Sequence, residues 1–420
     1  MPADSLRRAP ARGGDEVIDF PLCRDPRHEA AIRRVLVRCL DVVQERLGSD
    51  KLVALVLTGS FARGEGSVMS GERVPRVLGD IEFLAVLPGE VDFHRLRGSF
   101  PAWSEEASRL ASDEVRVDIE FGPVEIGYLA RRARPSIFVY DLIRHGKVIA
   151  GRADILGEVP AFTPADIPPH DAVHLVFNRL IEQLEAYDRA AELDDIALWD
   201  VAYQRTKLVL DLAGSALAFR GRHEPSYASR PRAFARLLEE EPALALALPP
   251  GFLGELDRAA RLKLVPGDGR DVLPPHLPPA AQRAWVRERI VAGVPAVASV
   301  LRWELEALLG MHGDLPPLLA RWMRRHHWTR RAWDWTKVAL HPVPAPVPLA
   351  RIRAARRAVT STPRALLYTA GALAYLNLHR PTARPSAIAR LLFVRRAARR
   401  DPAAQRQTIT LLWRWCVRNT

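Results

Sequence analysis

The first 160 residues combine helical and extended patterns of hydrophobic positions. Residues 27–47 carry apolar side chains at helical spacing, and Gly48 is a suitable helix end. Short apolar runs predict three buried strands, at residues 52–58, 80–87 and 115–121. A helix and one further short strand are expected between residues 137 and 151. This mixture predicts a small domain built around a mixed β-sheet.

Helical patterns dominate after the Pro-rich segment 157–170, which we interpret as a linker. Long helices are predicted at residues 171–190, 196–220, 232–246 and 280–310. Residues 341–348 have proline at every second position, which favours an extended, polyproline-like spacer. The predicted fold class is therefore α+β, with a small mixed-sheet domain followed by an α-helical C-terminal region.

These patterns divide the chain into four predicted segments. They are an N-terminal helical segment (1–50), the mixed-sheet domain (51–160), a helical region (170–340) and a basic helical tail (349–420).

Charge is distributed unevenly between these segments. The 420 residues carry a formal net charge of +12, but residues 321–420 contain 21 Lys and Arg and only two acids, a net charge of +19. The first 320 residues hold 40 bases and 47 acids, a net charge of −7. The protein is thus an acidic body with a basic C-terminal part, and any polyanionic partner is expected to bind residues 321–420.

Cysteine content and hydropathy indicate the cellular compartment in which the protein is expected. The three cysteines form no C-x-x-C pair, which argues against a disulfide scaffold or a zinc ribbon and favours a reducing, cytoplasmic location. The longest mildly apolar run, Leu366–Leu378, has 13 residues, fewer than the roughly 20 needed to span a bilayer. No transmembrane segment is predicted.

Two of the predicted strands carry paired acids. In DIEF, Asp80 and Glu82 project from one face of the strand, because side chains at i and i+2 share a face. The strand VRVDIEF repeats the arrangement with Asp118 and Glu120. Adjacent strands would gather three or four carboxylates, and a divalent cation is the natural way to offset their repulsion.

A phosphate-binding turn is predicted just upstream of the first acidic pair. The strand at 52–58 ends in Gly59 and Ser60, followed by a helical or loop segment. Glycine lets the backbone approach an anion, and the following N–H groups and the Ser60 hydroxyl can donate to it. A phosphate cradle beside a metal-binding acidic cluster indicates metal-assisted phosphoryl or nucleotidyl transfer.

In this order, the motifs LTGSFARGEGS, GDIEF and VRVDIEF resemble the DNA polymerase β-type nucleotidyltransferase superfamily, which includes the aminoglycoside nucleotidyltransferases. The resemblance covers residues of about 50–155. Gly59 and Ser60 match its Gly-Ser pair, Asp80 and Glu82 its paired metal ligands, and Asp118 its third carboxylate, with Glu120 as the alternative. Gly59 and Asp80 are 21 residues apart, and VMSGERVPRV resembles an insertion at the mouth of the site.

The resemblance implies transfer of an NMP from an NTP to an acceptor hydroxyl, with release of pyrophosphate. Asp80, Glu82 and Asp118 would hold two Mg²⁺ ions, with Mn²⁺ as an alternative, and Asp118 would help to deprotonate the acceptor. The helical region would bind the acceptor. A small molecule is the expected acceptor, because an acidic body repels a long polyanion.

Two basic residues are further candidates for binding the nucleotide. Arg63 follows the Gly-Ser turn and is either a phosphate contact or a solvated arginine. Lys207 is one of only five lysines among 61 basic residues. It is either a triphosphate contact or the partner of Asp211 at i+4.

The basic C-terminal part has three interpretations. Six of the ten tryptophans lie beyond residue 320, interspersed with arginine. This composition suits binding of nucleic acid, binding of an anionic membrane surface, or a basic helical cap with its tryptophans packed inward. The alternative function is a non-catalytic, NTP-sensing protein that associates with nucleic acid or membrane through residues 321–420.

Overall fold

The computed structural model describes residues 19–419, except 49–50, 71–72, 193–194, 268–269, 271, 341–356, 382 and 393–400. The predicted spacer at 341–348 lies outside the described residues. The chain forms two compact units. The first comprises residues 1–162 together with 263–269, and the second comprises 163–262 and 270–420. The boundary after Phe162 lies within the Pro-rich segment 157–170.

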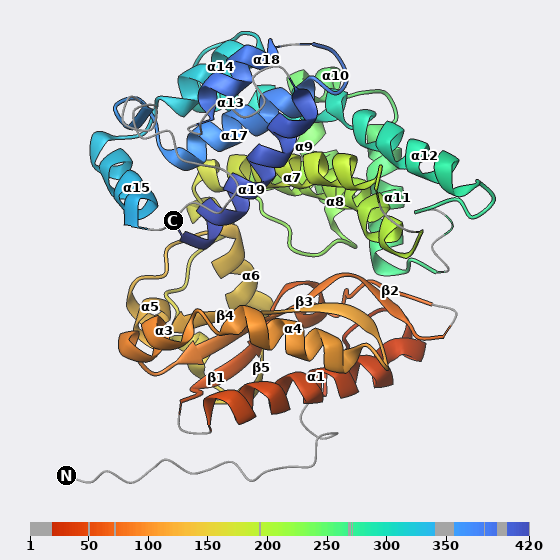
Figure 1. Ribbon diagram of the computed structural model, residues 1–420, viewed down its shortest axis with the longest axis vertical. Coiled ribbons are helices and arrows are strands. Elements are labelled where there is room, and N and C mark those ends of the chain that lie inside the picture. The colour runs from red at the N-terminus through yellow and green to blue at the C-terminus, as the bar shows by residue number, and fades with distance from the viewer. Residues whose placement is uncertain are drawn as a thin grey trace. The chain divides into compact units, whose positions relative to one another are not determined.

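The first unit is built on a five-stranded mixed sheet (Figure 1). Its strands are β1 (Ala54–Leu57), β2 (Val68–Met69), β3 (Arg76–Leu87), β4 (Arg116–Glu125) and β5 (Lys147–Gly151). The strand order is β2-β3-β1-β5, with β4 also paired to β3. Only the β3–β4 pair is parallel; the other pairs are antiparallel. The α+β class predicted from the sequence agrees with this sheet and with the helical second unit.

Two hydrophobic layers cover the sheet, because successive residues of a strand face opposite sides. On one side α1 (Pro26–Leu47) and α4 (Phe100–Ala111) pack on a core that includes Leu55, Ile81 and Phe83. On the other side the core contains residues of α5 (Ile126–Arg131), α6 (Ile137–His145) and the 3₁₀ turn Ile155–Glu158. The remaining helices of this unit are the short α2 (Gly59–Ala62) and α3 (Glu90–Leu96).

The second unit contains helices and no strand among its described residues. In chain order they are α7 (Pro169–Arg189), α8 (Asp195–Phe219), α9 (Arg230–Glu240), α10 (Pro242–Ala247), α11 (Phe252–Leu264), α12 (Pro279–Val291), α13 (Val294–Leu309), α14 (Leu315–Met323), α15 (Trp328–Leu340), α17 (Pro363–Leu376), α18 (Pro385–Leu391) and α19 (Pro402–Asn419). The end of α11, from Lys263 onward, belongs to the first unit.

Two helices predicted as continuous are each broken in two. The run 232–246 divides into α9 and α10 because Pro242 opens a new helix after Glu241, whose backbone is non-helical (φ −120°, ψ 67°). The run 280–310 divides into α12 and α13 at Gly293, two residues before Pro295. A proline near a helix start costs no hydrogen bond, but it cannot continue the preceding helix.

The apolar run Leu366–Leu378 forms most of α17, the central helix of the second unit. All residues of α17 except Arg364 are buried, and α7, α14, α18 and α19 pack around this helix. A helix enclosed by others is apolar on every side, which explains the composition of this run. No helix in the described part of the chain has the length and apolar character needed to cross a membrane.

A carboxyl group is enclosed in the second unit. Glu304 of α13 is fully buried, and its Oε1 is hydrogen-bonded to the Ser215 hydroxyl. The same hydroxyl lies 2.8 Å from the carbonyl oxygen of Ala172, which can only accept a proton. The Ser215 hydroxyl thus lies within donating distance of two acceptor oxygens, one of Glu304 and one of Ala172. Burial raises the pKa of Glu304 from 4.5 to about 8, consistent with a neutral carboxylic acid.

We expect the stability of the protein to fall as pH rises from about 4.5 to about 8. The folded state binds the Glu304 proton more tightly than the unfolded chain, so up to ~1.4 kcal/mol of unfolding free energy is lost per pH unit in this window. Glu304→Gln keeps a neutral hydrogen-bonding group and should remove this dependence. Urea denaturation between pH 5 and 9 measures it, with the exposed Glu239→Gln as control. Parallel pH profiles for the wild type and Glu304→Gln would contradict the prediction.

Candidate metal and nucleotide site

The two acidic strands predicted from the sequence lie next to each other. β3 and β4 pair in parallel, and the register places Asp80 opposite Asp118 and Glu82 opposite Glu120. Ile81 and Phe83 are buried beneath the sheet, which leaves the four acids on the opposite face. Farther along β3, Leu84 and Val86 on the acidic face are covered by the α5–α6 layer. The acids thus lie on the part of this face that the α5–α6 layer does not cover.

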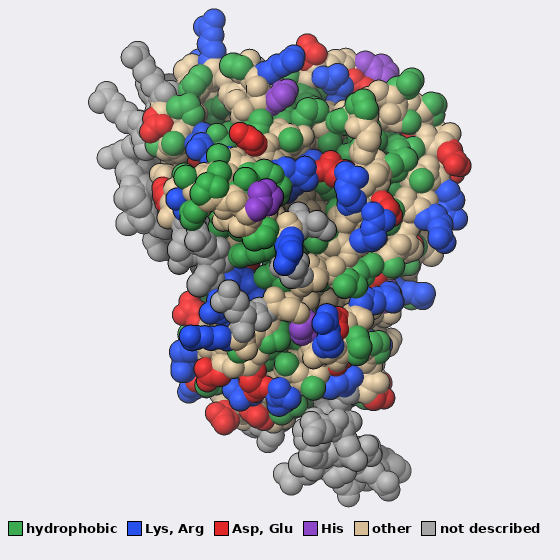
Figure 2. Space-filling view, turned by 90° about the vertical axis from the view of Figure 1, so that its right-hand side faces the viewer, with side chains coloured by type: hydrophobic (Ala, Val, Ile, Leu, Met, Phe, Trp, Pro, Cys, Tyr) green, Lys and Arg blue, Asp and Glu red, His purple; other side chains and the backbone are tan. Residues whose placement is uncertain are grey.

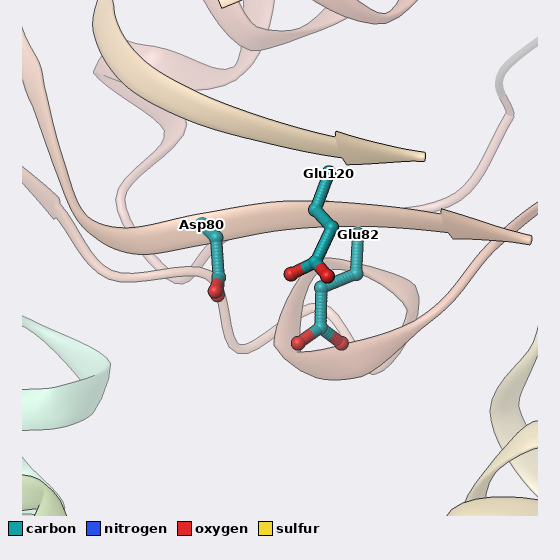
Figure 3. Close-up of side chains that lie close together, drawn as sticks. All are labelled: Asp80, Glu82 and Glu120. Atoms are coloured by element: carbon teal, nitrogen blue, oxygen red, sulfur yellow. The ribbon is translucent and has the colours of Figure 1, made fainter. Parts of the chain in front are cut away.

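Three of the four carboxylates form a cluster. Asp80, Glu82 and Glu120 each offer an oxygen that lies within 4.8 Å of the others. Figure 3 shows their side chains pointing to the same side of the sheet. Asp80 and Glu82 are half-buried and Glu120 is exposed. This is the one group of three or more metal-ligating side chains among the residues that the structure describes.

Asp118, the expected third ligand, is not one of the three. It is exposed and lies on the same face of β4, but opposite Asp80 rather than Glu82. Glu120 is longer by one methylene group, and its carboxylate lies close to those of Asp80 and Glu82 (Figure 3). The structure therefore brings Glu120 into the cluster in the place that the resemblance gives to Asp118.

The chemistry of the cluster fits a hard divalent cation. Three carboxylates this close repel one another, and each oxygen is a ligand type that Mg²⁺ and Mn²⁺ prefer. Asp80, Glu82 and Glu120 are the residues that would hold such an ion.

Gly59 brings the turn predicted to bind phosphate against this cluster. It has a φ of +66°, and a Cβ atom at this position would lie 2.7 Å from Glu82 Oε2. Just before it, the Thr58 amide donates to the carbonyl oxygen of Glu82 over 2.9 Å. The helix that follows, α2, has a single turn, so its dipole adds little. The backbone at Gly59 and the Glu82 carboxylate are thus held in contact.

Lys263 is a basic residue at this site that the sequence analysis missed. It is 6% exposed, and its Nζ lies 3.4 Å from the Ser60 hydroxyl oxygen. Its backbone carbonyl accepts a hydrogen bond from the Ser67 hydroxyl, and Gly267 accepts one from the Ser70 amide over 3.2 Å. These contacts attach residues 263–267 to the first unit and place an ammonium group at the Gly59–Ser60 turn.

Arg63 lies beneath the turn as part of a buried ion-pair cluster. Its side chain is 6% exposed and lies 3.2 Å from an oxygen of Asp141 and 3.5 Å from one of Glu65. A solvated Arg63, one of the two interpretations, is therefore wrong, and contact with phosphate stays a prediction. Nearby, burial and then the positive charge of Arg63 lower the pKa of His145.

Lys207 lies on α8 in the second unit, where it is half-buried. The expected alternative partner, Asp211, instead accepts a hydrogen bond from Arg179 Nε over 2.7 Å. A triphosphate contact of Lys207 stays a prediction.

The two ends of the segment interpreted as an insertion, VMSGERVPRV, pair with each other as strands. β2 pairs with the start of β3, with Val68 opposite Val77 and Met69 opposite Arg76. A register irregularity between Arg76 and Asp80 follows in the β3–β4 pair. β3 thus begins four residues ahead of Asp80, in the part that pairs with β2.

No family model matches the chain. A search of curated proteins likewise finds no match. Among solved structures, one similar chain is the spectinomycin adenyltransferase AAD(9) from Enterococcus faecialis, solved with ATP and spectinomycin. It is 14% identical, the match covers 61% of this chain and 98% of that chain, and the TM-score is 0.35.

The tryptophans beyond residue 320 divide into two groups. Trp322, Trp335 and Trp415 are buried, and Trp413 donates to the Asn178 side chain over 3.1 Å. Trp328 and Trp333 of α15 are 64% and 60% exposed. Inward packing thus accounts for four of the six. Binding of nucleic acid or of an anionic membrane through residues 321–420 stays a prediction.

Proposed function

We propose that the first unit catalyses metal-dependent nucleotidyl transfer from an NTP to a hydroxyl group, as in the polymerase β-type superfamily. The observation that carries this proposal is the cluster of Asp80, Glu82 and Glu120 beside the turn at Gly59. Carboxylates alone would repel a triphosphate. Together with a divalent cation and a lysine, they make a site that suits one.

Each residue of the proposed site has a distinct role. Asp80, Glu82 and Glu120 would hold Mg²⁺ or Mn²⁺, with two ions expected. When bound, the metal supplies Lewis-acid polarisation of the α-phosphate and neutralises charge on the leaving pyrophosphate. The Gly59 backbone allows the close approach of the Glu82 carboxylate to the turn, and Ser60 and Lys263 would donate hydrogen bonds to a phosphate there.

Asp118 is the proposed general base. It is exposed on β4, next to the cluster but outside it, so its carboxylate is accessible to an incoming hydroxyl. In this role it accepts the acceptor's proton as the oxygen attacks the α-phosphorus. The helical second unit is proposed to bind the acceptor, which we expect to be a small molecule.

The direct test is release of pyrophosphate. The full-length protein is incubated with Mg²⁺, each α-labelled NTP in turn and a metabolite extract, and the labelled product is identified. Pyrophosphate formed together with a labelled acceptor supports the proposal. Tight NTP binding without release across a broad acceptor screen would instead favour the NTP-sensing alternative.

We expect Lys263→Met to weaken NTP binding by about tenfold, because a charge-assisted hydrogen bond contributes roughly 1.5–3 kcal/mol. Methionine keeps the aliphatic stem that packs in the buried position. Nucleotide affinity is measured by calorimetry in the presence of Mg²⁺. Lys207→Met tests the lysine predicted from composition, and Lys337→Met serves as control. Unchanged affinity in Lys263→Met would remove this lysine from the proposed site.

A further inference from the structure

The second unit contains a hollow with no role in the proposed reaction. Its volume is about 490 Å³, within the range typical of small-molecule sites. Residues of α7, α12 and the segment after α17 line it, namely Tyr187, Ala284, Arg287, Val291, Ala292 and His379, together with Glu288. Figure 2 views the molecule from the side on which α12 lies and shows Lys and Arg side chains set among apolar ones.

Arg287 provides a positive charge in this hollow, and part of its guanidinium has no hydrogen-bond partner. Its guanidinium carbon lies over the Tyr187 ring, 4.2 Å from the ring centre, a cation–π contact. Its Nε is buried and has no hydrogen-bond partner. Within the described residues the guanidinium forms no ion pair. A buried donor without a partner is costly, and a ligand oxygen would relieve that cost.

The surrounding charges favour an anion. Arg406 also lies over the Tyr187 ring, at 5.2 Å, but its charge is balanced by Asp188, which accepts from its Nε over 2.8 Å. Glu288 is exposed, so water screens its negative charge. The Asp188 carboxylate also attracts Arg287, so Arg287 and Arg406 share this one carboxylate and the three side chains keep one positive charge. The exposed His379 adds a further donor at the hollow.

Apart from Arg287, Glu288 and His379, the lining is aliphatic or aromatic. Ala284, Val291 and Ala292 present aliphatic surface, and Tyr187 presents an aromatic ring. A ligand that fills this space therefore combines a flat apolar body with one anionic group. An inorganic anion would accept hydrogen bonds from Arg287 but would leave the apolar side chains of the hollow in contact with water.

We propose that this hollow binds a small organic anion, a carboxylate or phosphate ester with a flat apolar body, through Arg287 and Tyr187. The site is independent of the carboxylate cluster in the first unit and does not depend on the proposed transferase activity. Binding at this site forms and breaks no covalent bond.

The test uses 2-naphthoate as probe and the full-length protein without NTP. Calorimetry should show saturable binding that weakens by about tenfold in Arg287→Gln, as expected for loss of a charge-assisted hydrogen bond. Tyr187→Leu should weaken it as well, because it removes the ring that orients the guanidinium. Arg283→Gln changes an arginine on the same helix outside the hollow, and its affinity should stay within about twofold of wild type.

A second measurement keeps the test valid if Arg287→Gln fails to fold. The neutral analogue 2-naphthamide should bind wild-type protein about tenfold more weakly than 2-naphthoate, because it carries no charge for Arg287. Inorganic phosphate should also bind more weakly than 2-naphthoate. The proposal is overturned by absence of saturable 2-naphthoate binding, by equal affinity for the amide, or by unchanged affinity in Arg287→Gln.

Discussion

Asp80→Asn will abolish NTP-dependent pyrophosphate release, with a loss of at least ~10³-fold, equivalent to about 4 kcal/mol of transition-state stabilisation. The amide keeps the size of the side chain but removes the negative charge that would hold the metal. Glu82→Gln should have an effect of the same size, since Glu82 lies in the same cluster. The measurement is the steady-state rate of pyrophosphate release at saturating Mg²⁺. The acceptor substrate in this assay is the one identified from the labelled product.

Comparison of Glu120 and Asp118 makes this prediction more specific. Glu120→Gln should raise the Mg²⁺ concentration needed for half-maximal rate, because Glu120 belongs to the cluster. Asp118→Asn should lower kcat and leave the Mg²⁺ dependence unchanged, as expected for a base outside it. Glu90→Gln, on the exposed surface of α3, is the control. Full activity in Asp80→Asn and Glu82→Gln would refute catalysis at this site.

Gly59→Ala is expected to damage both the fold and the site. Alanine at φ +66° costs roughly 1–2 kcal/mol of stability, because a left-handed backbone is strained for any residue with a Cβ. The new methyl group would also lie 2.7 Å from Glu82 Oε2 and displace that carboxylate. We therefore expect activity to fall by about 100-fold or more, with weakened Mg²⁺ dependence.

The control for this substitution is Gly157→Ala. Gly157 lies in the same unit, in the 3₁₀ turn Ile155–Glu158; its φ is not left-handed, and an added Cβ would meet nothing within 4 Å. Its stability and activity should match wild type within about 0.5 kcal/mol and twofold. Urea denaturation and pyrophosphate release are measured on both variants. Equal behaviour of the two alanine variants would show that the close approach at Gly59 has no consequence.

Local periodicity allowed much of the first unit to be predicted. The i, i+2 rule places Asp80 and Glu82 on one face and Ile81 and Phe83 on the other, and the structure has the same alternation. The helix at 27–47 and its end at Gly48 likewise depend only on neighbouring residues. Features of this kind are encoded within about ten residues of sequence, so they are readable without tertiary information.

The membership of the cluster depends on the pairing of two strands. A hydrophobic residue before Asp118 and the family pattern favoured that aspartate, but neither reports the register between β3 and β4. The structure pairs Glu82 with Glu120, and the longer side chain reaches the cluster. Register and side-chain length are tertiary properties, which explains why sequence reasoning left the choice between Asp118 and Glu120 open.

Lys263 was missed for a similar reason. It is another of the five lysines, the same property that drew attention to Lys207, but no local pattern connects residue 263 with residue 60. The helix breaks at Pro242 and Gly293 were visible in the sequence as single residues. Their effect was underestimated because the apolar periodicity continues on both sides of each break.

The attachment of Lys263 to the first unit has a consequence for biosynthesis. A ribosome makes the sheet, the Gly59–Ser60 turn and the acidic strands first, but the lysine follows only after residues 163–262 of the second unit. The nascent chain can therefore fold its sheet early, yet it lacks the ammonium group at the turn until most of α11 has been synthesised. Completion of this site is coupled to synthesis of the helical unit, so a chain interrupted before residue 263 has the carboxylates without the lysine.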